Sequence, residues 1–147
     1  MTRHPSYPNA KRLSGKKADK LPDIAWKDDP DELNYKAAGT FLSLFLPQPM
    51  VSACVSALRT VGTRQYNPHD LLRAARLKPA KASDVTYGQE LAKVEAGELW
   101  SPVLLVAMYP RLIIADGYHR TSVAYDLDEQ PVWARIVPCH NPEEGDS

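Results

Sequence analysis

The sequence predicts an α+β protein in which a small mixed sheet with flanking helices is preceded by an α-helical hairpin. Two observations predict this fold class. Apolar runs at residues 103–107 and 112–115 are short and bounded by turn residues, which is typical of buried strands. Upstream, apolar residues recur at spacings of three and four over residues 34–60, which is typical of helices. The 147 residues are enough for one domain of ordinary size with its own core.

Composition and charge restrict the function. Eighteen basic and eighteen acidic residues cancel, so nucleic-acid binding would rest on a local patch. Two cysteines, Cys54 and Cys139, are too few for a disulfide framework and lack the spacing of metal ligands, which favours a reducing compartment. No stretch approaches the roughly 20 apolar residues of a membrane span, and the first residues lack the apolar core of a signal peptide. We therefore expect a cytoplasmic protein with no membrane contact.

Residues 1–22 are predicted to form a basic flexible arm. They contain six lysines and arginines against the single acid Asp19, and few apolar residues, so they cannot bury enough surface to offset the entropy of ordering. The arm is either a solvated tail or a tether to nucleic acid. At the other end, residues 139–147 are predicted to be an acidic tail.

Residues 23–64 are predicted to form a helical hairpin packed on the core. Its helices cover residues 34–46 and 50–60, and Pro47 and Pro49 break the helix between them. The apolar face of this hairpin needs a partner. The simplest partner is the sheet of the C-terminal half of the same chain, and a homodimer interface is the alternative.

Residues 65–138 are predicted to form the main domain. Asn67 is expected to cap its first helix, and Ser83 or Asp84 its second. The predicted elements, in order, are helices at 69–77 and 85–96 and strands at 103–107, 112–115 and 131–137. The first two strands should pair as a hairpin, and because both are apolar at nearly every position we expect helices on both faces of the sheet.

A sharp turn is predicted directly after the second strand. Asp116 and Gly117 are residues that tolerate the positive φ angles of a tight turn. The helix that follows should be capped by Thr121 or Ser122. This stretch therefore predicts the order strand, glycine turn, helix start.

The start of this helix is a candidate anion site. The first amides of a helix have no intrahelical partner and carry partial positive charge. His119 and Arg120 lie at the same place in the sequence. Together these groups predict a pocket that fits a phosphate.

The run Asp116-Gly117-Tyr118-His119-Arg120, called the box below, also resembles a known superfamily. With residues 101–106 before it and 131–137 after it, the box is similar to the ParB/sulfiredoxin superfamily, over about half the chain at residues 70–138. Members pair a Pro-Ile/Val strand with a second strand that ends in a Gly-x-His-Arg or Gly-Glu-Arg-Arg box. They include partition ParB domains that bind CTP, sulfiredoxins that use ATP, kinases of free serine, and nucleases. The resemblance implies a nucleotide ligand, with ATP, ADP and CTP as candidates.

The resemblance also implies roles for the residues of the box. Arg120 would contact phosphate oxygens, and His119 would donate a hydrogen bond to them. Backbone amides around Gly117, Tyr118 and Thr121 would surround the phosphate group.

Further candidates extend this predicted site. Asp116 and His119 are the candidate catalytic residues, and Asp116 is also the candidate ligand of Mg²⁺, through water. Arg73 and Arg76 lie three residues apart in the predicted helix at 69–77 and are candidate second phosphate contacts.

The residue at position 118 of the box differs between members of the superfamily that catalyse different reactions. Sulfiredoxins have their catalytic cysteine there, so Tyr118 disfavours sulfinic-acid reduction. The most similar box is the Asp-Gly-His-His-Arg of the free-serine kinases, which also use an upstream glutamate as base. Glu90, Glu95 and Glu98 are candidates for that glutamate, although Glu90 and Glu95 are most simply surface acids.

Three functional hypotheses follow. The first is a nucleotide- or phosphate-binding protein, with phosphotransfer as its candidate reaction. The second is a ParB-like nuclease or nucleic-acid-binding module, in which the basic arm adds attraction to the backbone. The third is a non-catalytic interaction protein in which the box only organises the fold.

Overall fold

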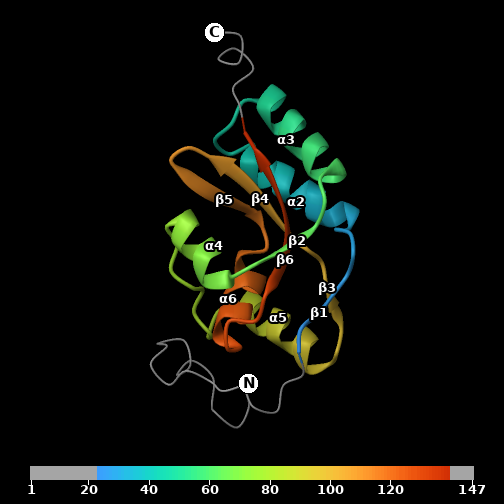
Figure 1. The fold of residues 1–147 in the computed structure, drawn as a ribbon, viewed down its shortest axis with the longest axis vertical. Coiled ribbons are helices and arrows are strands. Elements are labelled where there is room, and N and C mark those ends of the chain that lie inside the picture. Colours follow the sequence, from blue (N-terminus) through green and yellow to red (C-terminus); the bar gives the residue numbers. More distant parts are fainter. Residues whose placement is uncertain (1–22, 140–147) are drawn as a thin grey trace.

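The computed structural model describes residues 23–139, with helices on both sides of a small sheet (Figure 1). The elements in chain order are β1 (Ala25–Trp26), α2 (Glu32–Leu42), α3 (Gln48–Thr60), β2 (Arg64–Tyr66), α4 (Pro68–Ala75), α5 (Val85–Glu95), β3 (Leu99–Trp100), β4 (Val103–Met108), β5 (Arg111–Asp116), α6 (Tyr118–Asp126) and β6 (Val132–Pro138). The predicted arm at 1–22 and residues 140–147 of the predicted tail lie outside the described residues. None of the described helices has the length and apolar character needed to cross a membrane. The predicted α+β class is confirmed.

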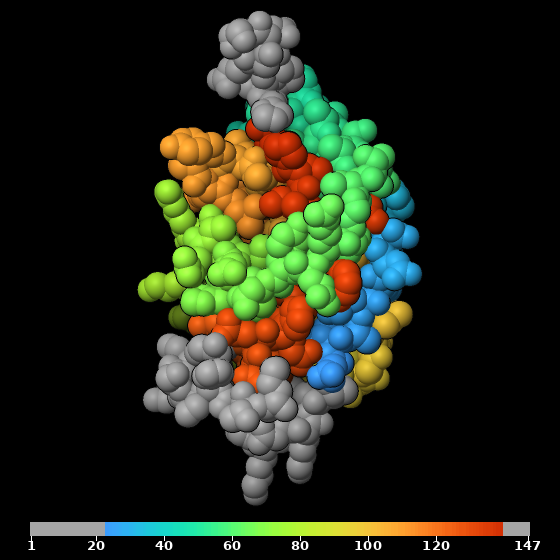
Figure 2. Space-filling view, viewed as in Figure 1, coloured from blue at the N-terminus to red at the C-terminus, as the bar shows by residue number. Residues whose placement is uncertain are grey.

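The four-stranded sheet has the order β2-β6-β4-β5. β4 and β5 form the predicted antiparallel hairpin, in which Leu105 lies opposite Ile114. β6 runs parallel to β4, with Leu105 opposite Ile136. β5 is an edge strand of the sheet, and α6 connects it to β6. In Figure 2 the β4–β5 hairpin lies at the upper left margin of the described residues.

Two cores lie on the two faces of this sheet. In β4, Val103 and Leu105 belong to one core, and Leu104 and Val106 belong to the other. The first core also contains apolar residues of α4, α5 and α6, whereas the second contains those of α2 and α3. Both faces of β4 are therefore covered by helices, which explains its continuous apolar sequence and confirms the expectation.

The predicted helical hairpin is confirmed, and the sheet is the partner of its apolar face. The buried side chains that it adds to the second core are Tyr35, Ala38, Leu42, Val51, Cys54 and Leu58. α3 begins at Gln48, two residues earlier than predicted, with Pro47 as its N-cap. Pro49 is tolerated inside the first turn because the amide that it lacks would have no helical partner there.

Three short strands, β1, β2 and β3, were not predicted. β1 pairs in parallel with β3, and Lys27 N donates a hydrogen bond to Trp100 O at 2.8 Å. β2 pairs antiparallel to β6 at the other edge of the main sheet. Strands of two and three residues are too short to show a period of two in sequence, and their backbone partners are far away along the chain.

Helix caps decide where the remaining helices begin. The Asn67 side chain accepts hydrogen bonds from the amides of His69 and Asp70 at 2.8 and 3.2 Å, as predicted. Asp84, rather than Ser83, caps α5 by accepting from the Thr86 amide at 2.9 Å. The Asp84 cap fixes the C-terminal end of the loop between α4 and α5, which faces the start of α6.

Candidate functional site

A glycine turn joins β5 directly to α6. Gly117 is the N-cap of α6 and has φ +110°, the left-handed conformation that the sequence predicts. A Cβ at this position would lie 2.6 Å from Val103 Cγ2, so glycine is also required by the close packing of the turn on β4. The prediction that Thr121 or Ser122 caps the helix is wrong, because the turn is sharp enough for helical geometry to begin at Tyr118.

Thr121 and Ser122 lie inside α6 and bond to backbone groups instead. Thr121 Oγ1 donates to Gly117 O at 2.9 Å, four residues earlier. Ser122 Oγ donates to Tyr118 O at 3.0 Å and accepts from the Ala80 amide at 2.9 Å. Ser122 thereby fixes the loop before α5 to the first turn of α6.

Arg120 points into the protein and pairs with two carboxylates. Its Nη2 lies 2.9 Å from Asp116 Oδ2, and its Nη1 lies 3.4 Å from Glu90 Oε2. Only 9% of the residue is exposed. Its Nε is buried without a hydrogen-bond partner among residues 23–139. The guanidinium therefore compensates two buried or partly buried acids instead of facing solvent at the helix start.

Asp116 links α6 to the opposite layer of the fold. Its Oδ2 accepts from Asn34 Nδ2 at 3.1 Å as well as from Arg120. Asn34 in turn accepts from the Asp31 amide at 2.7 Å, within the capping box of α2. This chain of hydrogen bonds runs from the start of α2 to the start of α6, past the end of β5.

The surroundings of Asp116 do not fit a directly coordinated divalent cation. Asp116 Oδ2 already accepts from the Arg120 guanidinium, whose positive charge opposes a second cation bound directly to this carboxylate. Residues 23–139 also contain no group of three or more His, Cys, Asp or Glu side chains placed to hold a metal ion.

Glu90 is buried, contrary to the prediction of a surface acid. Only 7% of it is exposed, and it contacts both Arg120 and Lys93, whose Nζ lies 3.1 Å from Glu90 Oε1. The sequence contained a signal for this position. Glu90 continues the helical stripe of Tyr87, Leu91 and Val94 at spacings of three and four, and a charged residue in such a stripe indicates a buried partner.

His119 lies at the surface, on the side of the loop before α5. Its Nε2 is 3.3 Å from Asp84 Oδ2, and 27% of its side chain is exposed. The hydrogen bond with His119, together with the one from the Thr86 amide, lowers the pKa of Asp84 below its ordinary value. Tyr118 is beside it, with the two rings 5.2 Å apart, and donates from its hydroxyl to Lys78 O at 2.6 Å.

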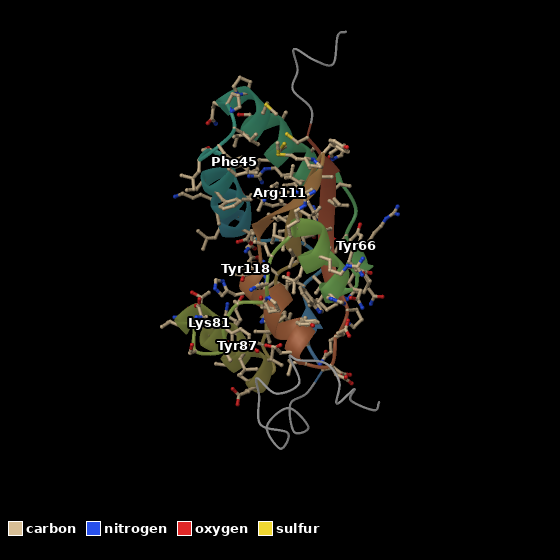
Figure 3. All side chains as sticks on the ribbon, turned by 90° about the vertical axis from the view of Figure 1, so that its left-hand side faces the viewer. Phe45, Tyr66, Lys81, Tyr87, Arg111 and Tyr118 are labelled. Atoms are coloured by element: carbon tan, nitrogen blue, oxygen red, sulfur yellow. The ribbon has the colours of Figure 1, made fainter. Side chains whose placement is uncertain are left out.

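A shallow cleft of about 380 Å³ opens beside these residues. It is lined by Pro79, Ala80, Lys81, Ser83, Asp84 and Tyr118. In Figure 3 the labelled Lys81 and Tyr118 lie on the same side of the molecule, where the loop before α5 meets the start of α6. The cleft therefore joins the exposed part of the box to one lysine, Lys81, that sequence reasoning missed.

The structure does not bring Arg73 and Arg76 to the box. Both are exposed, and neither makes a hydrogen bond or ion pair with a box residue in the described part of the chain. Arg76 is the C-cap of α4, with φ +59°, so it lies beyond the helix and the spacing argument for a shared face does not apply.

Comparisons with protein-family models, with curated proteins and with solved structures find no match for this chain. The resemblance of the box and its flanking strands to the ParB/sulfiredoxin superfamily therefore stays a prediction from sequence.

Proposed function

We propose that this protein binds a phosphate-bearing ligand, a nucleotide in the first instance, at the start of α6. The observation that carries the proposal is the open helix start at Gly117, with His119 partly exposed beside it. Gly117 has no side chain to cap the helix, and Thr121 is the first residue whose amide bonds back, to Gly117 O at 2.9 Å. The amides of His119 and Arg120 precede it and have no acceptor within the helix.

The charges around the helix start support the proposal. No acidic residue occupies the first turn of α6, so the partial positive charge of the helix end is not compensated from within. Lys81 adds a donor in the lining of the cleft, and His119 adds a second one beside it, where it contacts the lining residue Asp84. A cleft of about 380 Å³ is in the range of small-ligand sites, which is roughly 300–1,000 Å³.

In this proposal Asp84 competes with the ligand phosphate for His119. Its carboxylate already pairs with His119, as a ligand phosphate would. Its side chain is 42% exposed, so little packing prevents it from giving way to a ligand. Asp84→Asn keeps a good helix cap for α5, because asparagine caps as well as aspartate does, while it removes the competing charge.

Arg120 is a positioning residue in this proposal. Its guanidinium holds Asp116 and Glu90, and so fixes the end of β5 against α5 and α6. Binding of the phosphate then depends on the amides at the helix start, on His119 and on Lys81.

The test is isothermal titration calorimetry with ATP, ADP, CTP and pyrophosphate, each with and without Mg²⁺. His119→Ala should weaken phosphate binding about 10- to 100-fold, because a charge-assisted hydrogen bond contributes roughly 1.5–3 kcal/mol. Asp84→Asn should strengthen it about 2- to 5-fold. The matched control is His69→Ala, since His69 lies on α4 against Tyr125 and away from the cleft.

Other outcomes of the same experiment correspond to the other sequence hypotheses. ADP release from ATP would extend the proposal to phosphotransfer. Binding of DNA that weakens steeply with salt and needs residues 1–22 would favour the nucleic-acid hypothesis. Equal affinities of wild type and folded His119→Ala for every ligand would overturn the proposal and leave an interaction protein.

A further inference from the structure

The two cysteines of the chain lie together although 85 positions separate them in the sequence. Cys54 is on the face of α3 that packs on the sheet, and Cys139 directly follows β6. Both belong to the second core, where Cys139 packs against the cluster that contains Cys54. The backbone of Cys139 is held there by a hydrogen bond from its amide to Ala107 O at 3.0 Å. Figure 1 shows the end of β6 beside α3.

The two thiols differ in exposure. Cys54 is only 4% exposed, whereas Cys139 is partly exposed at the end of the sheet. Burial and a hydrogen bond with Cys139 raise the pKa of Cys54 to about 12. Because the thiolate is the reactive form, Cys54 resists direct oxidation, and Cys139 is the sulfur that an oxidant in solution reaches first.

We propose that Cys54 and Cys139 are a redox modification site, at which a hydroperoxide converts the two thiols into an intramolecular disulfide. The Cys139 thiolate attacks the peroxide, so that an S–O bond forms, the O–O bond breaks and one water or alcohol leaves. The sulfur of Cys54 then attacks the sulfenic acid. An S–S bond forms, the S–O bond breaks, and hydroxide leaves with the proton of Cys54 as a second water. Two thiols lose two electrons, and one peroxide gains them.

The disulfide would fasten α3 to the end of the sheet. The closed loop would run from residue 54 to residue 139 and contain α4, α5, α6 and the β4–β5 hairpin. Cross-links that close long loops remove much conformational freedom from the unfolded chain. The oxidised protein should therefore melt about 5–15 °C higher than the reduced protein.

The test exposes the full chain to hydrogen peroxide at low protein concentration, then unfolds it in guanidinium chloride and blocks free thiols with N-ethylmaleimide. Intact mass should show loss of two hydrogens and no added maleimide, and dithiothreitol should restore two reactive thiols. The melting temperature of the same samples should rise on oxidation and fall on reduction. Cys139→Ser, at the less buried position, should show neither change and is the control least at risk of misfolding.

Two results would overturn the inference. One is a folded wild-type protein whose Cys139 is oxidised to the sulfinic acid while Cys54 stays alkylatable after unfolding. The other is a covalent dimer through Cys139 that forms equally in Cys54→Ser, because the buried partner would then take no part.

Discussion

At the scale of single residues, Arg120 shows how burial changes the role of a charged side chain. Its neighbour His119 is partly exposed and contacts Asp84, whereas Arg120 turns inward to Asp116 and Glu90. Consecutive residues of a helix point about 100° apart, so adjacent members of the box face different surroundings. One residue is therefore accessible from solvent, and the next holds β5, α5 and α6 together.

Arg120→Ala should lower the free energy of unfolding by about 3–5 kcal/mol, because it leaves Asp116 without its cation and leaves the buried Glu90 with only the half-exposed Lys93. Urea denaturation followed by circular dichroism measures the loss. Adding Glu90→Gln should recover part of it, since one uncompensated acid is then removed. Arg73→Ala, at an exposed position, should stay within about 0.5 kcal/mol of wild type. If Arg120→Ala keeps full stability but no longer binds phosphate, Arg120 contacts the ligand directly, as the sequence predicts.

At the scale of secondary structure elements, the starts of α5 and α6 form the candidate site together. Asp84 caps α5 and pairs with His119 of α6, while Ser122 of α6 holds the Ala80 amide of the loop before α5. The sequence predicted both helices and the glycine turn. It did not predict that their starts face each other, because that contact depends on the tertiary packing of α5 on α6.

The Asp84 cap should make the stability of this contact dependent on pH. His119 and the Thr86 amide hold the pKa of Asp84 below its ordinary value of 3.8. A carboxyl group with a lowered pKa in the folded state stabilises the fold above its unfolded pKa, and this stabilisation is lost as the pH falls through the folded value. The stability advantage of wild type over Asp84→Ala should therefore be present above pH 4 and shrink below it.

Chemical denaturation of wild type and Asp84→Ala between pH 2 and pH 6 measures this advantage. Asp70→Ala is the control, since Asp70 lies in the first turn of α4 and its side chain makes no ion pair within residues 23–139. An advantage that stays constant over this pH range would show that the carboxylate charge of Asp84 does not stabilise the helix start.

At the scale of the whole molecule, Arg135 connects the sheet to the α2–α3 layer. It lies on β6 and is 7% exposed. Its guanidinium donates to Tyr35 Oη at 3.0 Å and to the carbonyl oxygens of Leu58 and Arg59 at 3.1 and 3.2 Å. These are the last carbonyls of α3, which have no amide partner within the helix, so the arginine caps α3 from the sheet.

Arg135→Ala should destabilise the protein by about 2–4 kcal/mol, because several buried acceptors lose their donor at once. Asp29→Asn should cost less than about 1 kcal/mol, although Asp29 Oδ1 lies 2.5 Å from Arg135 Nη2, because 78% of the aspartate side chain is exposed to solvent. Urea titrations of both variants measure the difference. Equal losses would mean that the ion pair, rather than the cap on α3, is what Arg135 contributes.

The sequence by itself determined the local features of this protein. The sequence predicted the helical hairpin, the β4–β5 hairpin, the glycine turn and the cap at Asn67, and it narrowed the cap of α5 to Ser83 or Asp84. Each of these depends on periodicity or turn chemistry within a few residues. The tertiary structure alone decided which side of α6 meets solvent, that Glu90 is buried beside Arg120, and that β1 and β2 exist. These features depend on partners up to 74 residues away, as between Ala25 and Leu99. A charge or a short extended segment shows its role only when that partner is in place.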